Sequence, residues 1–381
     1  MIGPLSNITI VDFSQFLSGP SCTLRLADLG AEVIKIEKPA TGDICRQLYV
    51  SNVVLEGQSS LFHAINRNKK SFTADLKEDK DLAAIKKLLA VADVLVHNFR
   101  PGVMERLGLD YATVRAINPR IIYASISGYG NEGVWKGEPG QDLLVQAVSG
   151  LTWLSGGASD GPVPMGVSVA DILAGTYLTQ GILAALYRRT QKGYGGTVDV
   201  NMLESSIDYQ FELFSTFLND GGELPQRSLV NPVHAYVSAP YGIYETSDGY
   251  LAIAMTPVPK LGELLGCQEL LAYTDPANWF TQRDEIKSHL ADHLKNNTTA
   301  YWLERLEPAD IWCAPVLNYE ALRQEEAYQV LNMEQEVSTS QGTVITTTRC
   351  PIRINGKIFK SPVGAPALGE HTEILKEKYN L

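Results

Sequence analysis

The chain has 381 residues, 45% of them hydrophobic, so it is long enough for two or three domains with a large core. Its formal net charge of -11 argues against nucleic acid and anionic membranes as partners, because both select basic protein surfaces. The longest apolar stretch, residues 172–187, is interrupted by polar residues and is too short to span a bilayer. We therefore expect a soluble, cytoplasmic protein.

The cysteines and histidines show no metal-ligand spacing, so no metal is expected. The cysteines are scattered along the chain and should be reduced, mostly buried thiols: Cys22, Cys45, Cys267, Cys313 and Cys350.

The first third of the chain alternates short β-branched runs with helical patterns. Strands are predicted at residues 7–13, 32–37, 93–97 and 120–125, and helices at 22–29, 81–91 and 111–117. Strands that alternate with helices predict a parallel sheet covered on both faces. In such sheets, ligands bind at the carboxyl ends of the strands.

After residue 130 the predicted helices lengthen. They cover residues 141–154, 169–191 and 201–219, and a glycine-rich linker follows at 221–225. The tripeptide Ser247-Asp248-Gly249 lies between strand-like runs at 241–246 and 250–255 and predicts a β-hairpin. Helices then run to about residue 306. The tail, with a strand-like segment at 343–354 and a helix from Glu370, is expected to pack back on the first domain.

A nucleotide-dependent dehydrogenase is the first enzyme class to test against this pattern. Glu37 at the end of the second predicted strand would suit a ribose-binding acid. The loop at residues 14–20, however, carries one glycine in place of the three in G-x-G-x-x-G. A pyrophosphate cannot approach this backbone past Phe16 and Leu17, so the class is excluded.

Asp171 lies where a glycine-bearing loop turns into a long apolar helix. Backbone N–H groups at a helix start favour negative charge, so an aspartate placed there can act as a nucleophile. Ser168 and Asp171 also match the pattern in which a helix caps itself, and spacing alone favours that structural role.

Several motifs occur in a fixed order along almost the whole chain. They are Val11-Asp12-Phe13, Gly19-Pro20, residues 29–39, Gly42-Asp43, residues 66–71, Asn98-Phe99-Arg100-Pro101-Gly102, residues 118–124, Ser127-Gly128-Tyr129-Gly130, Ser149-Gly150, Ser168-Val169-Ala170-Asp171, residues 314–317 and residues 368–372. In this combination the chain resembles the class III CoA-transferases, the family of formyl-CoA transferase and the CaiB/BaiF proteins.

The resemblance implies an α/β fold with two domains. A Rossmann-like large domain with a parallel sheet would begin with residues 1–220 and be completed by residues 331–381. A smaller α+β domain with its linkers would span residues 221–330. The resemblance also implies an interlocked homodimer.

By the same resemblance, Asp171 aligns with the family's nucleophile. An ionised aspartate would attack an acyl-CoA thioester, and CoA would then pass through Asp171 to a free carboxylic acid. CoA and acyl-CoA would be substrates, with no tightly bound cofactor. Carboxylates with ordinary pKa values of about 4 are already ionised at neutral pH, so no general base is required.

The resemblance further implies a set of CoA contacts: Gln15, Phe16, Leu17, Ser18, Lys38, Lys77, Asn98, Phe99, Arg106 and Met202. Lys38, Lys77 and Arg106 could neutralise phosphates, although each could equally be a solvated surface charge. The sequence departs from formyl-CoA transferase at Leu17, where that enzyme carries a side-chain amide. It departs again at residues 255–260, which lack a glycine run.

Two alternatives remain open. The 2-methylacyl-CoA racemases resemble the chain in the same segments, but they use a His-Asp pair where this chain has Gln141 and Asp142. An amide cannot accept a proton at neutral pH, so these two residues would instead support the substrate or an oxyanion. A non-catalytic CoA-binding module is the other alternative.

The donor and the acceptor are not identified by the sequence. The candidate pocket side chains would suit either polar or aromatic acids, and they are Arg46, Gln47, Tyr49, Trp153 and Tyr236.

Overall fold

The computed structural model describes residues 3–48 and 53–381. These fall into two compact units. Unit 1 is Met1–Val145, Ser168–Tyr209 and Val330–Leu381, and unit 2 is Gln146–Val167 and Gln210–Gln329. Residues 146–167 and 210–220, which we assigned to the first part of the large domain, thus group with unit 2.

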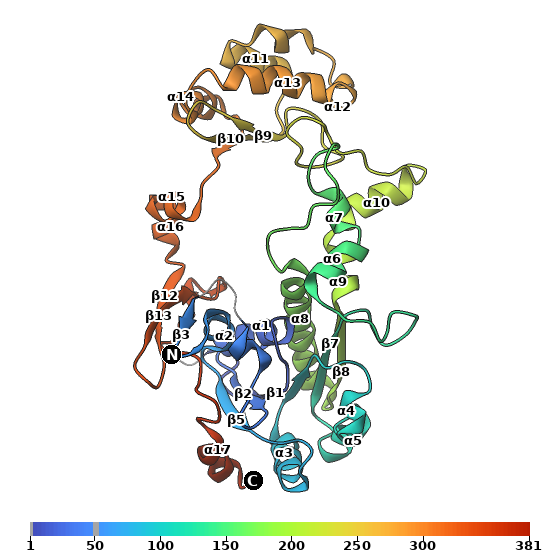
Figure 1. The fold of residues 1–381 in the computed structure, drawn as a ribbon, viewed down its shortest axis with the longest axis vertical. Coiled ribbons are helices and arrows are strands. Elements are labelled where there is room, and N and C mark those ends of the chain that lie inside the picture. Colours follow the sequence, from blue (N-terminus) through green and yellow to red (C-terminus); the bar gives the residue numbers. More distant parts are fainter. Residues whose placement is uncertain (1–2, 49–52) are drawn as a thin grey trace. The chain divides into compact units, whose positions relative to one another are not determined.

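Unit 1 is built on a six-stranded parallel sheet, as the alternating pattern predicted. The strand order is β5-β2-β1-β6-β7-β8 (Figure 1). The strands are β1 (Thr9–Asp12), β2 (Glu32–Glu37), β5 (Lys70–Thr73), β6 (Val94–His97), β7 (Ile122–Ser127) and β8 (Gly196–Asn201). The order reverses between β1 and β6, and their carboxyl ends form the crevice where ligands bind in open α/β sheets.

Helices cover both faces of this sheet. They are α1 (Ser18–Asp28), α2 (Ser60–Asn66), α3 (Asp79–Val91), α4 (Val103–Arg106), α5 (Tyr111–Ile117), α8 (Val169–Lys192), α9 (Met202–Tyr209) and α17 (Thr372–Tyr379). Alternate strand residues point to opposite faces, so Ile10 joins the core under α1 and α8 while Val11 joins the core under α3, α5 and α17.

Helix α1 begins four residues earlier than predicted, at Ser18. Gly19 and Pro20 had indicated a loop. Proline is tolerated in the first turn of a helix, however, because its missing N–H has no partner there. The earlier start places Ser18 at the N-terminus of α1, and this position matters for the candidate site.

Helix α8 has 24 residues and is long and apolar enough to cross a membrane by length and composition alone. It is longer than the apolar stretch that we judged too short to span a bilayer. It packs as a core helix of unit 1, with Ala174, Leu178 and Ile182 buried against the sheet and α1. Near its end Arg189 forms an ion pair with Asp93 at 2.7 Å.

The predicted helices at 141–154 and 201–219 are each interrupted. The first is divided into α6 (Asp142–Val148) and α7 (Leu151–Leu154) by Gly150, whose φ is 85°. The second is divided into α9 and α10 (Phe211–Asn219) at Gln210.

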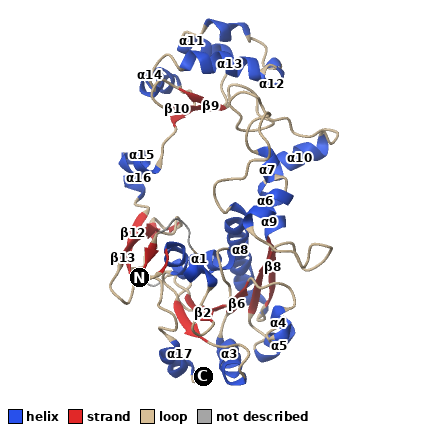
Figure 2. Cartoon of the chain, viewed as in Figure 1, coloured by secondary structure: helices blue, strands red, loops and turns tan. Residues whose placement is uncertain are grey.

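Unit 2 contains the predicted β-hairpin. Strands β9 (Gly242–Glu245), β10 (Tyr250–Ile253) and β11 (Cys313–Pro315) form an antiparallel sheet in the order β11-β10-β9. Figure 2 shows helices gathered around this hairpin, and their buried faces form one apolar core with it. The helices of this segment are α11 (Val258–Leu265), α12 (Asn278–Thr281), α13 (Arg283–Leu294) and α14 (Thr299–Leu306).

The tail returns to the sheet of unit 1, where the N–H of His371 donates to the carbonyl of Ser71 at 3.0 Å. The strand-like segment at 343–354 is not one strand. It divides between two hairpins, one pairing β12 (Glu334–Ser338) with β13 (Val344–Thr348) and the other pairing β14 (Arg353–Ile354) with β15 (Lys357–Ile358). The remaining short elements are β3 (Val54–Leu55), β4 (Gln58–Ser59), α15 (Tyr319–Gln324) and α16 (Glu326–Leu331).

Candidate active site

Asn98 connects the two loops that leave the carboxyl ends of β1 and β6. Its Oδ1 accepts the N–H of Gln15 at 2.8 Å, and its Nδ2 donates to the carbonyl of Gln15 at 2.7 Å. The same Nδ2 lies 3.3 Å from Oγ of Ser18. One amide side chain therefore fixes the crevice at the point where the strand order reverses.

Asp171 is in the first turn of α8 and directs its carboxylate toward the N-terminus of α1. The hydroxyl and the backbone N–H of Ser18 face the carboxylate as donors and lower its pKa. Ser18 is the first residue of an 11-residue helix, so the positive end of the α1 dipole faces the acid. The N-termini of two helices, α1 and α8, therefore favour a negative charge on Asp171.

The self-capping interpretation of Ser168 and Asp171 is wrong. Ser168 is the N-cap residue of α8, but its side chain makes no capping hydrogen bond. The N–H of Ala170 donates to Oδ1 of Asp142 at 2.8 Å instead. Because Asp142 caps α8, the carboxylate of Asp171 is available for another role.

The pKa of Asp171 is raised from 3.8 to about 6. Burial contributes most to this rise and the charge of Asp142 adds to it, whereas the hydrogen bonds from Ser18 oppose it. Our expectation of an ordinary carboxylate pKa is corrected accordingly. A partly desolvated carboxylate is a better nucleophile than a fully hydrated one, provided that it remains ionised.

Gly175 allows α1 and α8 to approach closely beside this pair. It lies one turn beyond Asp171 on the same face of α8. A Cβ at this position would lie 2.2 Å from Oγ of Ser21 and 2.6 Å from the carbonyl oxygen of Ser18. Only glycine therefore permits the separation at which Ser18 reaches Asp171.

Asp171 lines a cavity of about 620 Å³ within unit 1. Most of the residues predicted to bind CoA or support the substrate line the same cavity, namely Gln15, Phe16, Leu17, Ser18, Asn98, Phe99, Gln141, Asp142 and Met202. The structure thus gathers residues that are up to about 190 positions apart in the chain.

The predicted phosphate-binding cations lie elsewhere. Lys38, Lys77 and Arg106 are exposed and do not line this cavity. Arg100 and Lys136 do line it, and sequence reasoning did not select them. The position of Arg100 within Asn98-Phe99-Arg100-Pro101-Gly102 could have indicated its role, whereas Lys136 lies in a segment without a motif.

The proposed pocket side chains do not form an acceptor clamp. Arg46 is buried, and its guanidinium makes two hydrogen bonds of 2.7 Å to the carboxylate of Glu37. Its charge is therefore already balanced, and Glu37 is not free to bind a ribose. Gln47, Trp153 and Tyr236 do not line the cavity, and Tyr49 lies outside the described residues.

Among residues 3–48 and 53–381, no group of three or more His, Cys, Asp or Glu side chains is placed to hold a metal ion. The cavity itself presents carboxylate, hydroxyl, amide and backbone groups. Together they offer a desolvated acid beside fixed hydrogen-bond donors, which is an arrangement suited to acyl transfer.

Comparison with known proteins extends this description. A model of CoA-transferase family III matches residues 5–372. Succinyl-CoA:glutarate CoA-transferase of Homo sapiens is 31% identical over 385 residues, which cover 99% of this chain and 86% of that protein. Acetyl-CoA:oxalate CoA-transferase of Acetobacter aceti is 32% identical over 392 residues, which cover 99% and 96% of the two chains.

Solved structures include similar molecules. The crystal structure of a CaiB/BaiF family protein from Brucella suis aligns with a TM-score of 0.87 and 30% identity, covering 100% of both chains.

Proposed function

The chain belongs to CoA-transferase family III, and from that premise we propose that it transfers CoA from an acyl-CoA to a free carboxylic acid through a covalent intermediate on Asp171. The observation that carries this proposal is the placement of Asp171, which lines the cavity together with Ser18 at the N-terminus of α1.

In the first half of the reaction, a carboxylate oxygen of Asp171 attacks the thioester carbonyl. The C–S bond breaks, giving a mixed anhydride and the CoA thiolate. The thiolate then attacks the side-chain carbonyl carbon of Asp171, which releases the donor acid as its carboxylate. Asp171 now carries CoA as an aspartyl thioester.

In the second half, the acceptor carboxylate attacks the aspartyl thioester and forms a new mixed anhydride, again releasing the thiolate. The thiolate attacks the acceptor's acyl carbon, which yields the new acyl-CoA and restores the Asp171 carboxylate. One thioester replaces another, so no external energy source is needed. With a pKa of about 6, about nine-tenths of Asp171 would be ionised at pH 7.

Each tetrahedral intermediate carries an oxyanion that needs hydrogen-bond donors. The hydroxyl and N–H of Ser18 face Asp171 and are suited to that task, while Asn98 holds Ser18 in place through the contact of its Nδ2 with Oγ of Ser18. Arg100 and Lys136 add positive charge to the same cavity and are suited to hold the phosphates of CoA.

Asp171→Ala should abolish transfer while retaining CoA binding, because it removes the nucleophile and leaves the cavity wall in place. Hydroxylamine trapping during turnover, followed by peptide mass analysis, should recover a modified Asp171. A non-catalytic CoA-binding module would give no modified peptide and no dependence on Asp171.

The racemase alternative makes a different prediction. Gln141 lines the cavity where the racemase pattern carries histidine. Because an amide cannot take up the α-proton, we expect no exchange of the α-hydrogen of a 2-methylacyl-CoA in deuterated water. Measured exchange that depends on Asp142 would favour racemisation over transfer.

The substrates are proposed to be small organic acids and their CoA thioesters, because the two curated relatives above are named for succinyl-CoA and glutarate and for acetyl-CoA and oxalate. A panel of succinyl-CoA, acetyl-CoA, oxalyl-CoA and formyl-CoA donors against organic acids would identify the pair.

We also propose a cytoplasmic, interlocked homodimer. Exposed apolar side chains on α10, namely Phe211, Phe214 and Leu218, support a covered surface there. Light scattering should give twice the chain mass of 41.7 kDa.

A further inference from the structure

The loop between β1 and α1 holds an uncommon backbone conformation. Phe16 has a φ of 67°, in the left-handed region that bulky residues usually avoid. Phe16 lines the cavity, and two residues later Ser18 lines it beside Asp171 and lowers the pKa of that acid. The loop must therefore be held by specific contacts if Ser18 is to face the acid.

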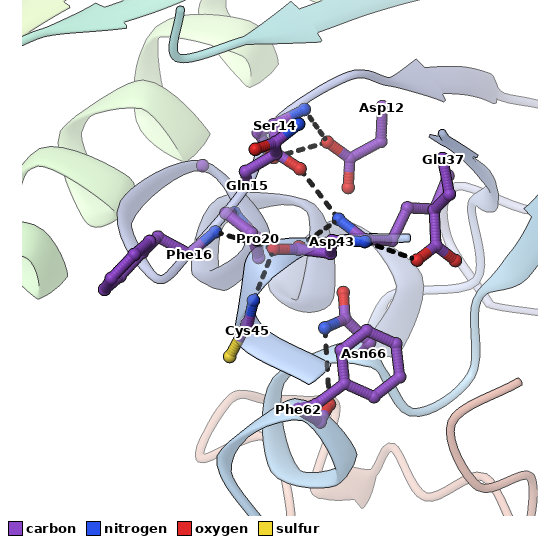
Figure 3. Close-up of polar contacts among 12 residues, drawn as sticks. Asp12, Ser14, Gln15, Phe16, Pro20, Glu37, Asp43, Cys45, Phe62 and Asn66 are labelled. Atoms are coloured by element: carbon purple, nitrogen blue, oxygen red, sulfur yellow. Dashed lines mark hydrogen bonds and ion pairs between the residues drawn. The ribbon is translucent and has the colours of Figure 1, made fainter. Parts of the chain in front are cut away.

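Those contacts come from a buried ion pair beneath the loop. Nζ of Lys35 donates to the carbonyl of Ser14 at 2.7 Å and lies 2.7 Å from Oδ2 of Asp43. Oδ1 of Asp43 accepts the N–H of Phe16 at 3.2 Å and that of Cys45 at 2.9 Å. Figure 3 shows Asp43 lying between the backbone of Phe16 and that of Cys45.

Further charges surround this pair and extend the network in two directions. Glu37 accepts the N–H of Asp43 at 3.0 Å and is paired with Arg46. On the other side, Asp12 accepts the N–H of Ser14 at 2.9 Å and lies 3.3 Å from Nζ of Lys69. These carboxylates and cations are all buried.

Lys35 is held in its charged form in this setting. Burial alone would lower the pKa of Lys35, but the facing carboxylates of Asp43 and Asp12 outweigh burial and raise it. Neither side chain of the pair lines the cavity, and both are 0% exposed. Their direct bonds are to the loop backbone at Ser14 and Phe16.

We propose that Lys35 and Asp43 are positioning residues, which hold the loop at residues 14–17 so that Ser18 presents its donors to Asp171. The expected loss of turnover when the pair is removed rests on the proposed function. The expected loosening of the loop does not. The cofactor and the acyl group would never touch either residue.

Two single variants and their combination test this role. Lys35→Met keeps the length of the side chain but removes the donor to Ser14. Asp43→Leu removes both the acceptor for the N–H of Phe16 and the charge that faces Lys35. Each single variant removes the nearest counter-charge of one buried group and should lower the melting temperature, while the double variant removes both charges and should recover much of it.

Transfer activity should not recover in the double variant. Loss of the loop contacts should lower kcat by about 10- to 100-fold in all three proteins, as small displacements at a reacting centre do, with a smaller change in KM for the acyl-CoA. A kcat that returns together with the melting temperature would show that the pair serves folding alone and would overturn the proposal.

Asp28→Asn provides the matched control. Asp28 forms a buried ion pair with Arg67 at the far end of α1 and makes no contact with the loop. This variant should lower the melting temperature while leaving kcat within about twofold of the wild type, because the loop at 14–17 is unaffected.

Amide hydrogen exchange gives a readout that does not depend on catalysis. Exchange at Gln15 and Phe16 should accelerate at least about tenfold in Lys35→Met and Asp43→Leu and remain unchanged in Asp28→Asn. Unchanged exchange in the folded variants would refute the positioning role. If the wild type proved to have no transferase activity, this exchange measurement would still decide the role of the pair.

Discussion

The carboxylate of Asp142 accepts the backbone N–H of Ala170 at 2.8 Å, one residue before Asp171. This contact has two consequences for the candidate site. It caps α8, which leaves the Asp171 carboxylate free to accept hydrogen bonds from Ser18. It also places a second negative charge near Asp171, which contributes to the raised pKa of that acid.

Asp142→Asn should lower the pKa of Asp171 from about 6 toward 3.8, because the neighbouring negative charge is removed. The acidic limb of the pH profile of kcat/KM should move to lower pH. The asparagine can still accept the N–H of Ala170, so thermal stability should change little. Asp142→Ala removes the acceptor as well and should be less stable by about 1 kcal/mol. If the acidic limb does not move in either variant, the charge of Asp142 does not raise the pKa of Asp171.

Ser18→Ala should move the acidic limb of the pH profile of kcat/KM in the opposite direction. The hydrogen bonds from Ser18 lower the pKa of Asp171, so removal of the hydroxyl should raise it and move the limb to higher pH. A hydrogen bond to a charged group contributes about 1.5–3 kcal/mol, so kcat/KM should fall by about 10- to 100-fold. Thr176→Ala, five residues beyond Asp171 on α8, is the control and should keep wild-type kinetics, because its exposed hydroxyl donates to the carbonyl of Ile172.

Asp171→Asn should stabilise the folded protein at neutral pH. Between pH 3.8 and about 6 the folded state binds more protons at Asp171 than the unfolded state does, so stability falls as pH rises through that window. Above the window the ionised acid lowers the free energy of unfolding by about 2–3 kcal/mol. The variant should therefore melt higher than the wild type at pH 7.5, and this difference should vanish at pH 4. Equal melting curves at both pH values would show that the acid is not desolvated.

Gly175→Ala should separate α1 from α8, because its Cβ would lie 2.6 Å from the carbonyl oxygen of Ser18. Alanine is favoured over glycine in a helix by about 1 kcal/mol, so any loss of stability and activity must come from the clash. We expect kcat to fall and the acidic limb to shift as in Ser18→Ala. Gly161→Ala is the control for a glycine replacement without a clash, since its Cβ would have nothing within 4 Å.

Arg100→Gln and Lys136→Gln should each weaken CoA binding by about tenfold at low salt, because each removes a positive charge from the cavity wall. Raising the salt concentration should reduce the difference in CoA affinity between each variant and the wild type. Isothermal titration with CoA measures both effects, and Lys357→Gln on the exposed β14–β15 hairpin should bind as the wild type does. The same assay applied to Lys38, Lys77 and Arg106 tests the contacts predicted from the sequence.

The sequence by itself determined the parallel α/β sheet and directed attention to Asp171. Alternating apolar strands and helical spacing are local patterns, and each requires only neighbouring residues to be recognised. These patterns indicated that ligands bind at the carboxyl ends of the strands, whereas Gln15 and Asn98 were predicted as CoA contacts from the resemblance to the class III CoA-transferases.

Only the tertiary structure decided which partners these residues have. Spacing favoured Ser168 and Asp171 as a mutual cap. The helix is instead capped by Asp142, which lies 28 positions before Ala170 and accepts the N–H of that residue. The sequence pattern likewise gave no reason to bury Lys35 against Asp43 or Arg46 against Glu37. Such pairings depend on strand order and on the loss of water around each charge. These are properties of segments brought together by folding, and no local pattern encodes them.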